Sequence, residues 1–222
     1  MTERWVISGS AGQGEAVLFL PGWGFSGRVL ELAGAGSGWI TPHLPLDPAS
    51  CVDELSGLIA GLGIGPVHLV GWSMGGNLAI NFAASFPEQV ARLTLLGMRA
   101  SWPAPEIDAI RSALCADPPA FMQDFFRKCL LGHRMEHQRF VREQQESLLA
   151  GLDMELLGRG LDYLAHWRLP DTIPHCPVAC WHGRRDVIAP VSERLLLPGA
   201  ADCVLEHAGH AVFLDRECII SD

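Results

Sequence analysis

Hydrophobic and polar residues over the first hundred positions form two alternating patterns. Short aliphatic or β-branched runs are typical of buried strands, and between them apolar residues recur with the spacing of a helix. This alternation predicts a mostly parallel sheet with helices on both faces, which is an α/β fold. Strands are expected at 4–8, 16–20, 39–44, 67–71 and 92–97, and helices (or, for the first, a turn) at 27–33, 50–62 and 74–86.

The pattern changes after position 100. Between about 103 and 167 no strand is expected, because apolar residues recur at helical spacing with turn signals between them. Alternation of strands and helices resumes at Cys176, so an all-helical insertion divides one α/β domain. We expect it to form a lid at the carboxyl ends of the strands, where such sheets bind ligands. The expected division is a core of 1–100 and 171–222 and a lid of 101–170.

One turn in this pattern carries chemistry. Residues 67–76 read Val-His-Leu-Val-Gly-Trp-Ser-Met-Gly-Gly, so an apolar strand passes through Gly-Trp-Ser-Met-Gly into a helix. In this context G-x-S-x-G is a nucleophile elbow, whose small residues let the backbone turn sharply and hold the serine hydroxyl clear of the sheet. The pentapeptide is common by chance, but its place between strand and helix assigns Ser73 as a nucleophile.

A serine nucleophile needs a histidine to take its proton, and the histidine needs an acid to fix its tautomer. The chain order in this kind of site is serine, acid, histidine. Asp186 ends a glycine-containing turn after an expected strand, and His210 lies on a loop after the next strand. We assign Asp186 as the orienting acid and His210 as the general base. His182 and His207 are the alternatives for the base, whereas Asp215 comes too late in the chain to be the acid.

An acyl-transfer site also needs two backbone N–H donors for the oxyanion, each worth about 3 kcal/mol in kcat. One is expected from Met74, the residue after the nucleophile. The other is expected from Trp23, in the Gly-Trp-Gly loop that follows the strand 16–20. Taken alone this loop is equally consistent with an ordinary turn, but the other three elements favour an oxyanion loop.

With these elements the chain resembles the α/β-hydrolase superfamily over nearly its whole length. Within it, the chain resembles the pimeloyl-[acyl-carrier protein] methyl ester esterases of biotin synthesis, although Pro21 stands where the family usually has a histidine. The resemblance implies an α/β-hydrolase fold and a serine carboxylesterase that frees the pimeloyl carboxylate, with acyl-carrier protein as partner and no metal or organic cofactor. The matching stretches are 20–24 (Leu-Pro-Gly-Trp-Gly), 70–76, 157–164 with Arg168 and Leu169 after it, and 208–213 (Ala-Gly-His-Ala-Val-Phe).

Charge is uneven along the expected lid. The stretch 125–142 carries five basic residues against one acid, Glu136, in a chain of formal net charge −9. A solvated helix face is the ordinary explanation of such a cluster. The resemblance gives it a use, because arginine pairs well with the carboxylates and phosphate of an acidic carrier. The residues expected to contact the carrier are Arg134, Arg139, Arg142 and Arg159.

Aromatic residues near these positions are candidates for lining an acyl channel. Trp23 and Trp72 adjoin the expected catalytic residues, and Phe140 lies in the expected lid. For any one of them, packing in the core is the alternative.

Composition excludes several other classes. The negative charge and a sequence pI near 5.4 argue against general nucleic-acid binding, which depends on phosphate neutralisation. No basic-then-apolar leader and no run of roughly 18 apolar residues occurs, so a soluble, cytoplasmic protein without membrane attachment is expected. A monomer is expected as well. Seven cysteines without C-x-x-C spacing suggest neither a disulfide framework nor a zinc site. About a dozen residues follow His210, so the final helix usual in this fold is expected to be shortened or missing.

Two further functions fit the same residues. A general short-chain carboxylesterase or thioesterase would use the same three catalytic residues with a less selective lid. A non-catalytic hydrolase-like binding protein would use only the pocket, and the presence of all three residues argues against it.

Overall fold

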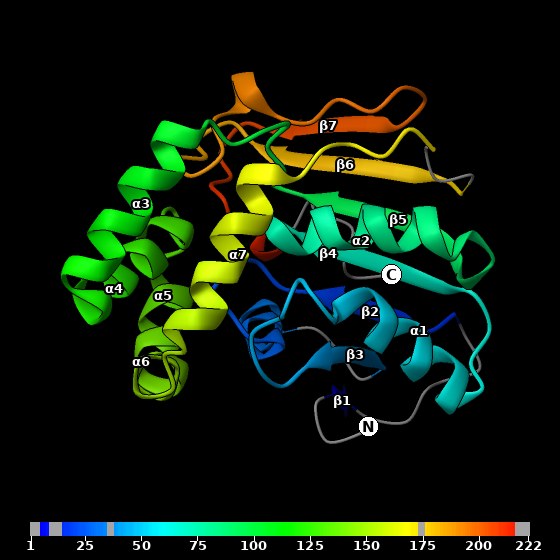
Figure 1. Cartoon of the computed structure of the whole chain (residues 1–222), viewed down its shortest axis with the longest axis horizontal. Coiled ribbons are helices and arrows are strands. Elements are labelled where there is room, and N and C mark those ends of the chain that lie inside the picture. The colour runs from blue at the N-terminus through cyan, green and yellow to red at the C-terminus, as the bar shows by residue number, and fades with distance from the viewer. Residues whose placement is uncertain (1–4, 9–14, 35–37, 173–175, 216–222) are drawn as a thin grey trace.

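The computed structural model describes residues 5–8, 15–34, 38–172 and 176–215. The described strands form one seven-stranded sheet in the order β1-β3-β2-β4-β5-β6-β7 (Figure 1). β1 runs antiparallel to β3, and all other neighbouring strands are parallel. The strands are β1 (Trp5–Ser8), β2 (Val17–Leu20), β3 (Trp39–Pro42), β4 (Val67–Trp72), β5 (Val90–Leu96), β6 (Val178–Gly183) and β7 (Ala201–Leu205).

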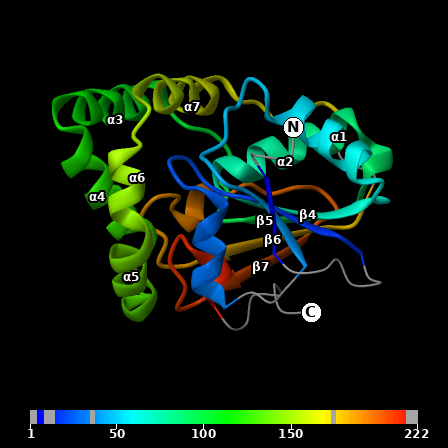
Figure 2. The same ribbon diagram turned by 90° about the horizontal axis from the view of Figure 1, so that it is seen from below.

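Helices cover both faces of the centre of this sheet. α1 (Cys51–Leu62) and α2 (Met74–Ser85) lie on one face, and the 3-10 helices η2 (Gly27–Ala33) and η6 (Val212–Leu214) lie on the other (Figure 2). A parallel strand that is covered on both faces has no side that meets solvent. All six residues of β4 are buried for this reason, which explains the almost continuous apolar run before the elbow.

The helices α3 to α7 connect β5 to β6 and lie beside one end of the sheet (Figure 1). Because this segment leaves from the end of β5, it stands at the edge where the parallel strands have their carboxyl ends. α7 is amphipathic and buries Leu157, Leu161 and Leu164, which lie on one face at helical spacing. The helices are α3 (Ala104–Ala116), α4 (Pro118–Cys129), α5 (Arg134–Phe140), the π-helical η4 (Val141–Gln145), α6 (Glu146–Ala150) and α7 (Met154–His166).

Aromatic packing joins these helices to the sheet. The ring centroid of Phe25 lies 4.9 Å from that of Trp72, 4.8 Å from that of Phe126 and 5.7 Å from that of Phe140. All four side chains are buried. The end of β4, the loop after β2 and the helices α4 and α5 therefore share one hydrophobic core.

The α/β fold predicted from the sequence is confirmed, with small shifts at the ends of elements. The strand predicted at 39–44 ends at Pro42, which has no N–H to extend the ladder. The strand predicted at 92–97 ends at Leu96, since Gly97 adopts a left-handed conformation with φ of +59°. Arg4, at the start of the predicted strand 4–8, and everything after Asp215 lie outside the described residues.

No described helix is long and apolar enough to cross a membrane. Among the described residues, no group of three or more His, Cys, Asp or Glu side chains is arranged to hold a metal ion.

Candidate active site

Ser73 stands at the turn between β4 and α2. Its φ of 53° and ψ of −122° are strained for a residue with a Cβ, and it is the single non-glycine residue with positive φ in the described part of the chain. A side chain at Gly75 would collide with the backbone carbonyls of Leu20 and Pro21, and one at Gly71 would collide with Gly76. The glycines of the G-x-S-x-G turn are therefore required by close backbone packing.

The loop after β2 comes close to the serine. A Cβ placed on Gly22 would lie 3.3 Å from the Cβ of Ser73, so the peptide of Trp23 is next to the elbow. Met74 is the first residue of α2, and the N–H groups of a helix's first turn have no acceptor within the helix. The two residues predicted to supply the oxyanion donors thus lie close to Ser73, at the start of a helix whose dipole favours negative charge.

Asp186 and His210 are in direct contact. His210 Nδ1–H donates to Asp186 Oδ2 at 2.7 Å, and both side chains are almost fully buried. The other carboxylate oxygen, Oδ1, accepts the backbone N–H groups of Ile188 and Ala189, each at 2.8 Å. Burial by itself raises the pKa of Asp186, but His210 and these two N–H groups lower it by more, so the pKa of this carboxyl lies below its usual value. Asp186 is therefore an anion that fixes which nitrogen of His210 carries the proton.

The backbone around His210 places its ring beside the elbow. The backbone carbonyl of His210 accepts the indole N–H of Trp72 at 2.9 Å, and the two ring centroids are 5.4 Å apart. A Cβ placed on Gly97 would lie 3.3 Å from His210 Nδ1. The backbone N–H of Ser73 donates to the backbone carbonyl of Leu96, the residue before Gly97, at 2.8 Å. The end of β5 thus touches both the serine and the histidine.

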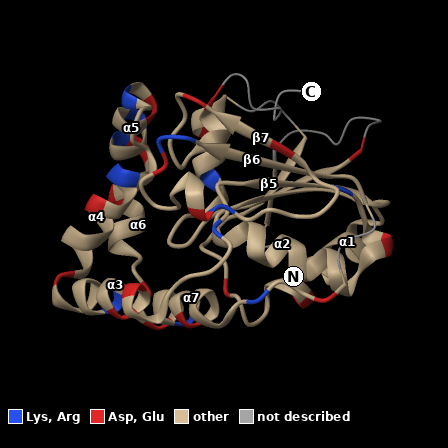
Figure 3. Cartoon of the chain, turned by 90° about the horizontal axis from the view of Figure 1, so that it is seen from above, with Lys and Arg blue, Asp and Glu red and all other residues tan. Residues whose placement is uncertain are grey.

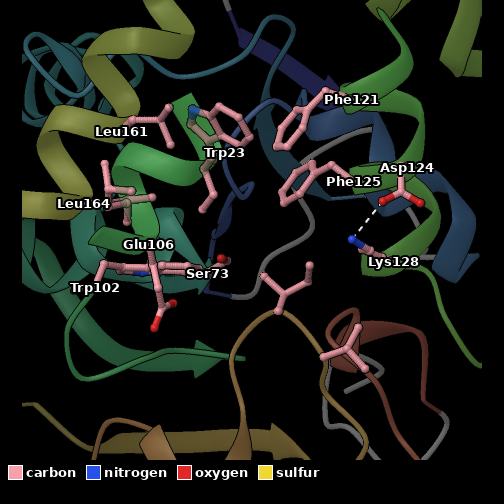
Figure 4. A pocket seen from close by; sticks show the side chains of 14 residues that line it. Trp23, Ser73, Trp102, Glu106, Phe121, Asp124, Phe125, Lys128, Leu161 and Leu164 are labelled. Atoms are coloured by element: carbon pink, nitrogen blue, oxygen red, sulfur yellow. Dashed lines mark ion pairs between the residues drawn. The ribbon is translucent and has the colours of Figure 1, made fainter. Parts of the chain in front are cut away.

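A cavity of about 280 Å³ opens beside Ser73 (Figure 4). Most of its wall is apolar, and Glu106 and the ion pair between Asp124 and Lys128 add charge. The wall is built from the loop after β2, the helices α3, α4 and α7, and the turn after Asp186. Its lining residues are Trp23, Ser73, Trp102, Glu106, Ile107, Ile110, Phe121, Asp124, Phe125, Lys128, Leu161, Leu164, Val187 and Ile188.

The arrangement of strand, elbow and paired acid and histidine agrees with a comparison against known families. A model described as the alpha/beta hydrolase family matches residues 17–217. The chain belongs to the alpha/beta hydrolase family. The match covers the elbow, the acid turn and the histidine loop.

Proteins with curated names are also similar over most of the chain. The pimeloyl-[acyl-carrier protein] methyl ester esterase of Chromobacterium violaceum is 29% identical, over 93% of this chain and 91% of that protein. The enzyme of the same name from Aromatoleum aromaticum is 29% identical, over 89% of this chain and 80% of that protein.

Solved structures of other proteins share the fold at lower identity. The enol-lactonase from Burkholderia xenovorans superposes with a TM-score of 0.77 at 16% identity, covering 96% of this chain and 90% of that chain. An esterase from Exiguobacterium antarcticum gives a TM-score of 0.75 at 19% identity, covering 96% of this chain and 89% of that chain.

The three aromatic residues singled out for an acyl channel have different places in the structure. Trp23 lines the cavity, and its indole N–H donates to the backbone carbonyl of Leu157 on α7 at 3.0 Å. Trp72 and Phe140 are fully buried in the aromatic core around Phe25 and are not among the residues that line the cavity. These two side chains therefore pack in the core and do not line the cavity.

Two acids that flank the basic stretch offset much of its charge. Asp124 forms ion pairs with both basic residues of the last turn of α4, and Glu143 pairs with Arg139 at 2.8 Å and with Arg142 at 2.7 Å. Arg134 is exposed and has no ion-pair partner among the described residues. Cations remain visible along α5 and its continuation (Figure 3). The sequence interpretation counted the charges of 125–142 but left out the acids on either side.

Arg159 lies on a different helix from the other three predicted arginines. It belongs to α7, and its guanidinium pairs with Asp47, in the segment between β3 and α1, at 2.9 Å. Exposed ion pairs of this kind contribute little stability, so such arginines can exchange one carboxylate partner for another.

Sequence reasoning missed most of the cavity wall. Phe121 and Phe125 come from α4, and Trp102 from the segment before α3. The two phenylalanines are four residues apart and therefore lie on one face of the helix, which was a usable signal. Val187 and Ile188 directly follow Asp186, so the turn that carries the acid also forms part of the wall.

Proposed function

We propose that this protein is a serine carboxylesterase that hydrolyses the methyl ester of pimeloyl-acyl-carrier protein. The observation that carries the proposal is the buried Asp186–His210 pair beside a strained Ser73 that faces a mostly apolar cavity. The names of the relatives at 29% identity support the choice of substrate.

In the proposed reaction, Ser73 Oγ attacks the ester carbonyl while His210 Nε2 accepts the hydroxyl proton. The N–H groups of Trp23 and Met74 donate to the oxyanion, and Asp186 stabilises the imidazolium. Collapse of the intermediate releases methoxide, which takes the proton from His210 and leaves as methanol. A water molecule activated by His210 then attacks the acyl-serine, which frees the pimeloyl carboxylate and restores Ser73.

The helices between β5 and β6 would act as a lid over this cavity. The proposal assigns 101–170 to the lid and 1–100 with 171–222 to the core. Support comes from the cavity wall, because α3, α4 and α7 supply most of its apolar residues. Closing such a wall over an ester excludes water and strengthens the electrostatic contacts inside.

The carrier would approach the basic surface of α5, with Arg134, Arg139 and Arg142 meeting its acidic face and Arg159 extending the contact along α7. Complementary charge speeds encounter between two proteins even when it adds little affinity. An acidic enzyme with a local cluster of arginines on its lid would thereby direct an acidic carrier toward the cavity.

The proposal is tested by mass-spectrometric turnover of pimeloyl-acyl-carrier-protein methyl ester beside p-nitrophenyl butyrate, with wild type and Ser73→Ala. We expect loss of one methyl group from the carrier-bound ester, abolished in Ser73→Ala. Hydrolysis of the nitrophenyl ester alone would point to the alternative, a general short-chain carboxylesterase or thioesterase. Silence of the folded wild type on both substrates would contradict the catalytic assignment and favour a binding protein.

A further inference from the structure

His182 is a buried, titratable side chain beside the proposed catalytic acid, and the proposed mechanism gives it no role. It is the penultimate residue of β6, and its side chain is only 4% exposed. Its Nε2 lies 2.7 Å from the backbone carbonyl oxygen of Ala189. Because a carbonyl oxygen can only accept, Nε2 carries a proton and donates this hydrogen bond.

The turn that carries Asp186 is held from two sides. The N–H of Ala189 donates to Asp186 Oδ1, and the carbonyl of the same residue accepts from His182. His182 Nε2 is 3.6 Å from Asp186 Oδ2, which is too long for a hydrogen bond. Oδ2 therefore stays available to His210, while His182 acts on the carboxylate through Ala189.

We propose that His182 is a positioning residue, whose Nε2–H fixes the turn 186–189 so that Asp186 accepts the Nδ1–H of His210. This inference rests on the proposed function of Ser73, Asp186 and His210. The same turn holds Val187 and Ile188 against the cavity, so its position also shapes the wall that an acyl group would touch.

The surroundings keep His182 in the neutral form that this role requires. Asp186 and His210 face it from the catalytic loops, and Arg194 faces it from the segment after η5 (Val191–Glu193), where its guanidinium is paired with Asp202. Burial lowers the pKa of His182 by more than the Ala189 carbonyl and Asp186 raise it, so the ring is uncharged at pH 7. A cationic ring at this place would compete with His210 for the carboxylate.

The kinetic test compares His182→Leu, which removes the donor, with His182→Gln, whose amide can reach the Ala189 carbonyl. We expect His182→Leu to lower kcat/KM for p-nitrophenyl butyrate by roughly 10- to 100-fold, because a displacement of catalytic groups by about 1 Å can cost this much. The pH profile of kcat/KM should change as well, because the contact between Asp186 and His210 is no longer held in place. His182→Gln should restore both kcat/KM and the pH profile. The matched control is His207→Gln, because His207 is an exposed histidine nearby.

A second readout needs no substrate. The His210 Nδ1 proton held by a carboxylate gives a low-field proton NMR signal, and we expect this signal in wild type and His182→Gln but broadened or absent in His182→Leu. A wild-type pH profile and signal in His182→Leu would overturn the proposal and leave His182 a packing residue. Should His182→Leu fail to fold, His182→Asn replaces it, because the amide of asparagine is too short to reach Ala189. Equal behaviour of His182→Asn and His182→Gln would then overturn the proposal. If the wild type hydrolyses no ester, the NMR comparison still decides the role of His182.

Discussion

At the scale of single residues, the carboxylate of Asp186 has the most demanding environment. It accepts three hydrogen bonds in a buried site, two from backbone N–H groups and one from His210. In Asp186→Asn one of these donors would face an amide N–H₂, and the tautomer of His210 would no longer be fixed. We expect kcat to fall roughly 10⁴-fold, as it does when the acid of a serine triad becomes an amide. Steady-state kinetics with p-nitrophenyl butyrate measures this, and a loss below tenfold would contradict the assignment of the acid.

The same carboxylate predicts a pH dependence of stability. The folded-state pKa of Asp186 lies below its ordinary value of 3.8, so its ionised form stabilises the fold above that pH, and this contribution is lost as the pH falls through the folded pKa. The difference in free energy of unfolding between wild type and Asp186→Asn should shrink as the pH falls below about 4. Urea denaturation across this range tests it, and a difference that does not change with pH would contradict the lowered pKa.

At the scale of elements, the approach of β4 and α2 to the loop after β2 depends on Gly75. A methyl group there would press on the carbonyls of Leu20 and Pro21, and backbone cannot yield as a side chain can. We expect Gly75→Ala to lower the free energy of unfolding by about 1–3 kcal/mol, the usual cost of overpacking. Gly57→Ala on α1 is the matched control, because it meets nothing within 4 Å and should raise stability by about 0.5–1 kcal/mol. Chemical denaturation measures the free energy of unfolding of both variants, and an equal change in the two would contradict the packing argument.

At the scale of the whole molecule, charge is distributed so that an acidic chain presents cations on α5. Arg134→Glu changes the exposed arginine that has no ion-pair partner among the described residues. We expect it to raise KM for the carrier-bound ester several-fold and to weaken the salt dependence of that KM, with no change for p-nitrophenyl butyrate. Arg92→Glu, on β5 away from the lid, is the control for net charge. A rise in KM that is equal in both variants would rule out a specific carrier surface.

The parts of the site that could be predicted from sequence are those with local signatures. Ser73 was identified by a strand, a turn and a helix in direct succession, and Asp186 by its place after the strand that follows the helical insertion. Both lie at the same edge of the sheet because parallel strands have their carboxyl ends there. His182 was noticed only as a possible rival of His210, because its hydrogen bond to Ala189 depends on how one turn folds back onto β6.

The sequence by itself determined the order and type of the elements and the elbow at Ser73, because each depends on residues close together in the chain. Tertiary structure alone decided which side chains face the cavity. It buried Trp72 and Phe140 in a core around Phe25, placed Phe121 and Phe125 in the same cavity wall as Ser73, and paired four of the five basic residues of 125–142 with acids outside that stretch. An amphipathic pattern reports that a face is covered, but what covers it depends on contacts between segments far apart in the chain.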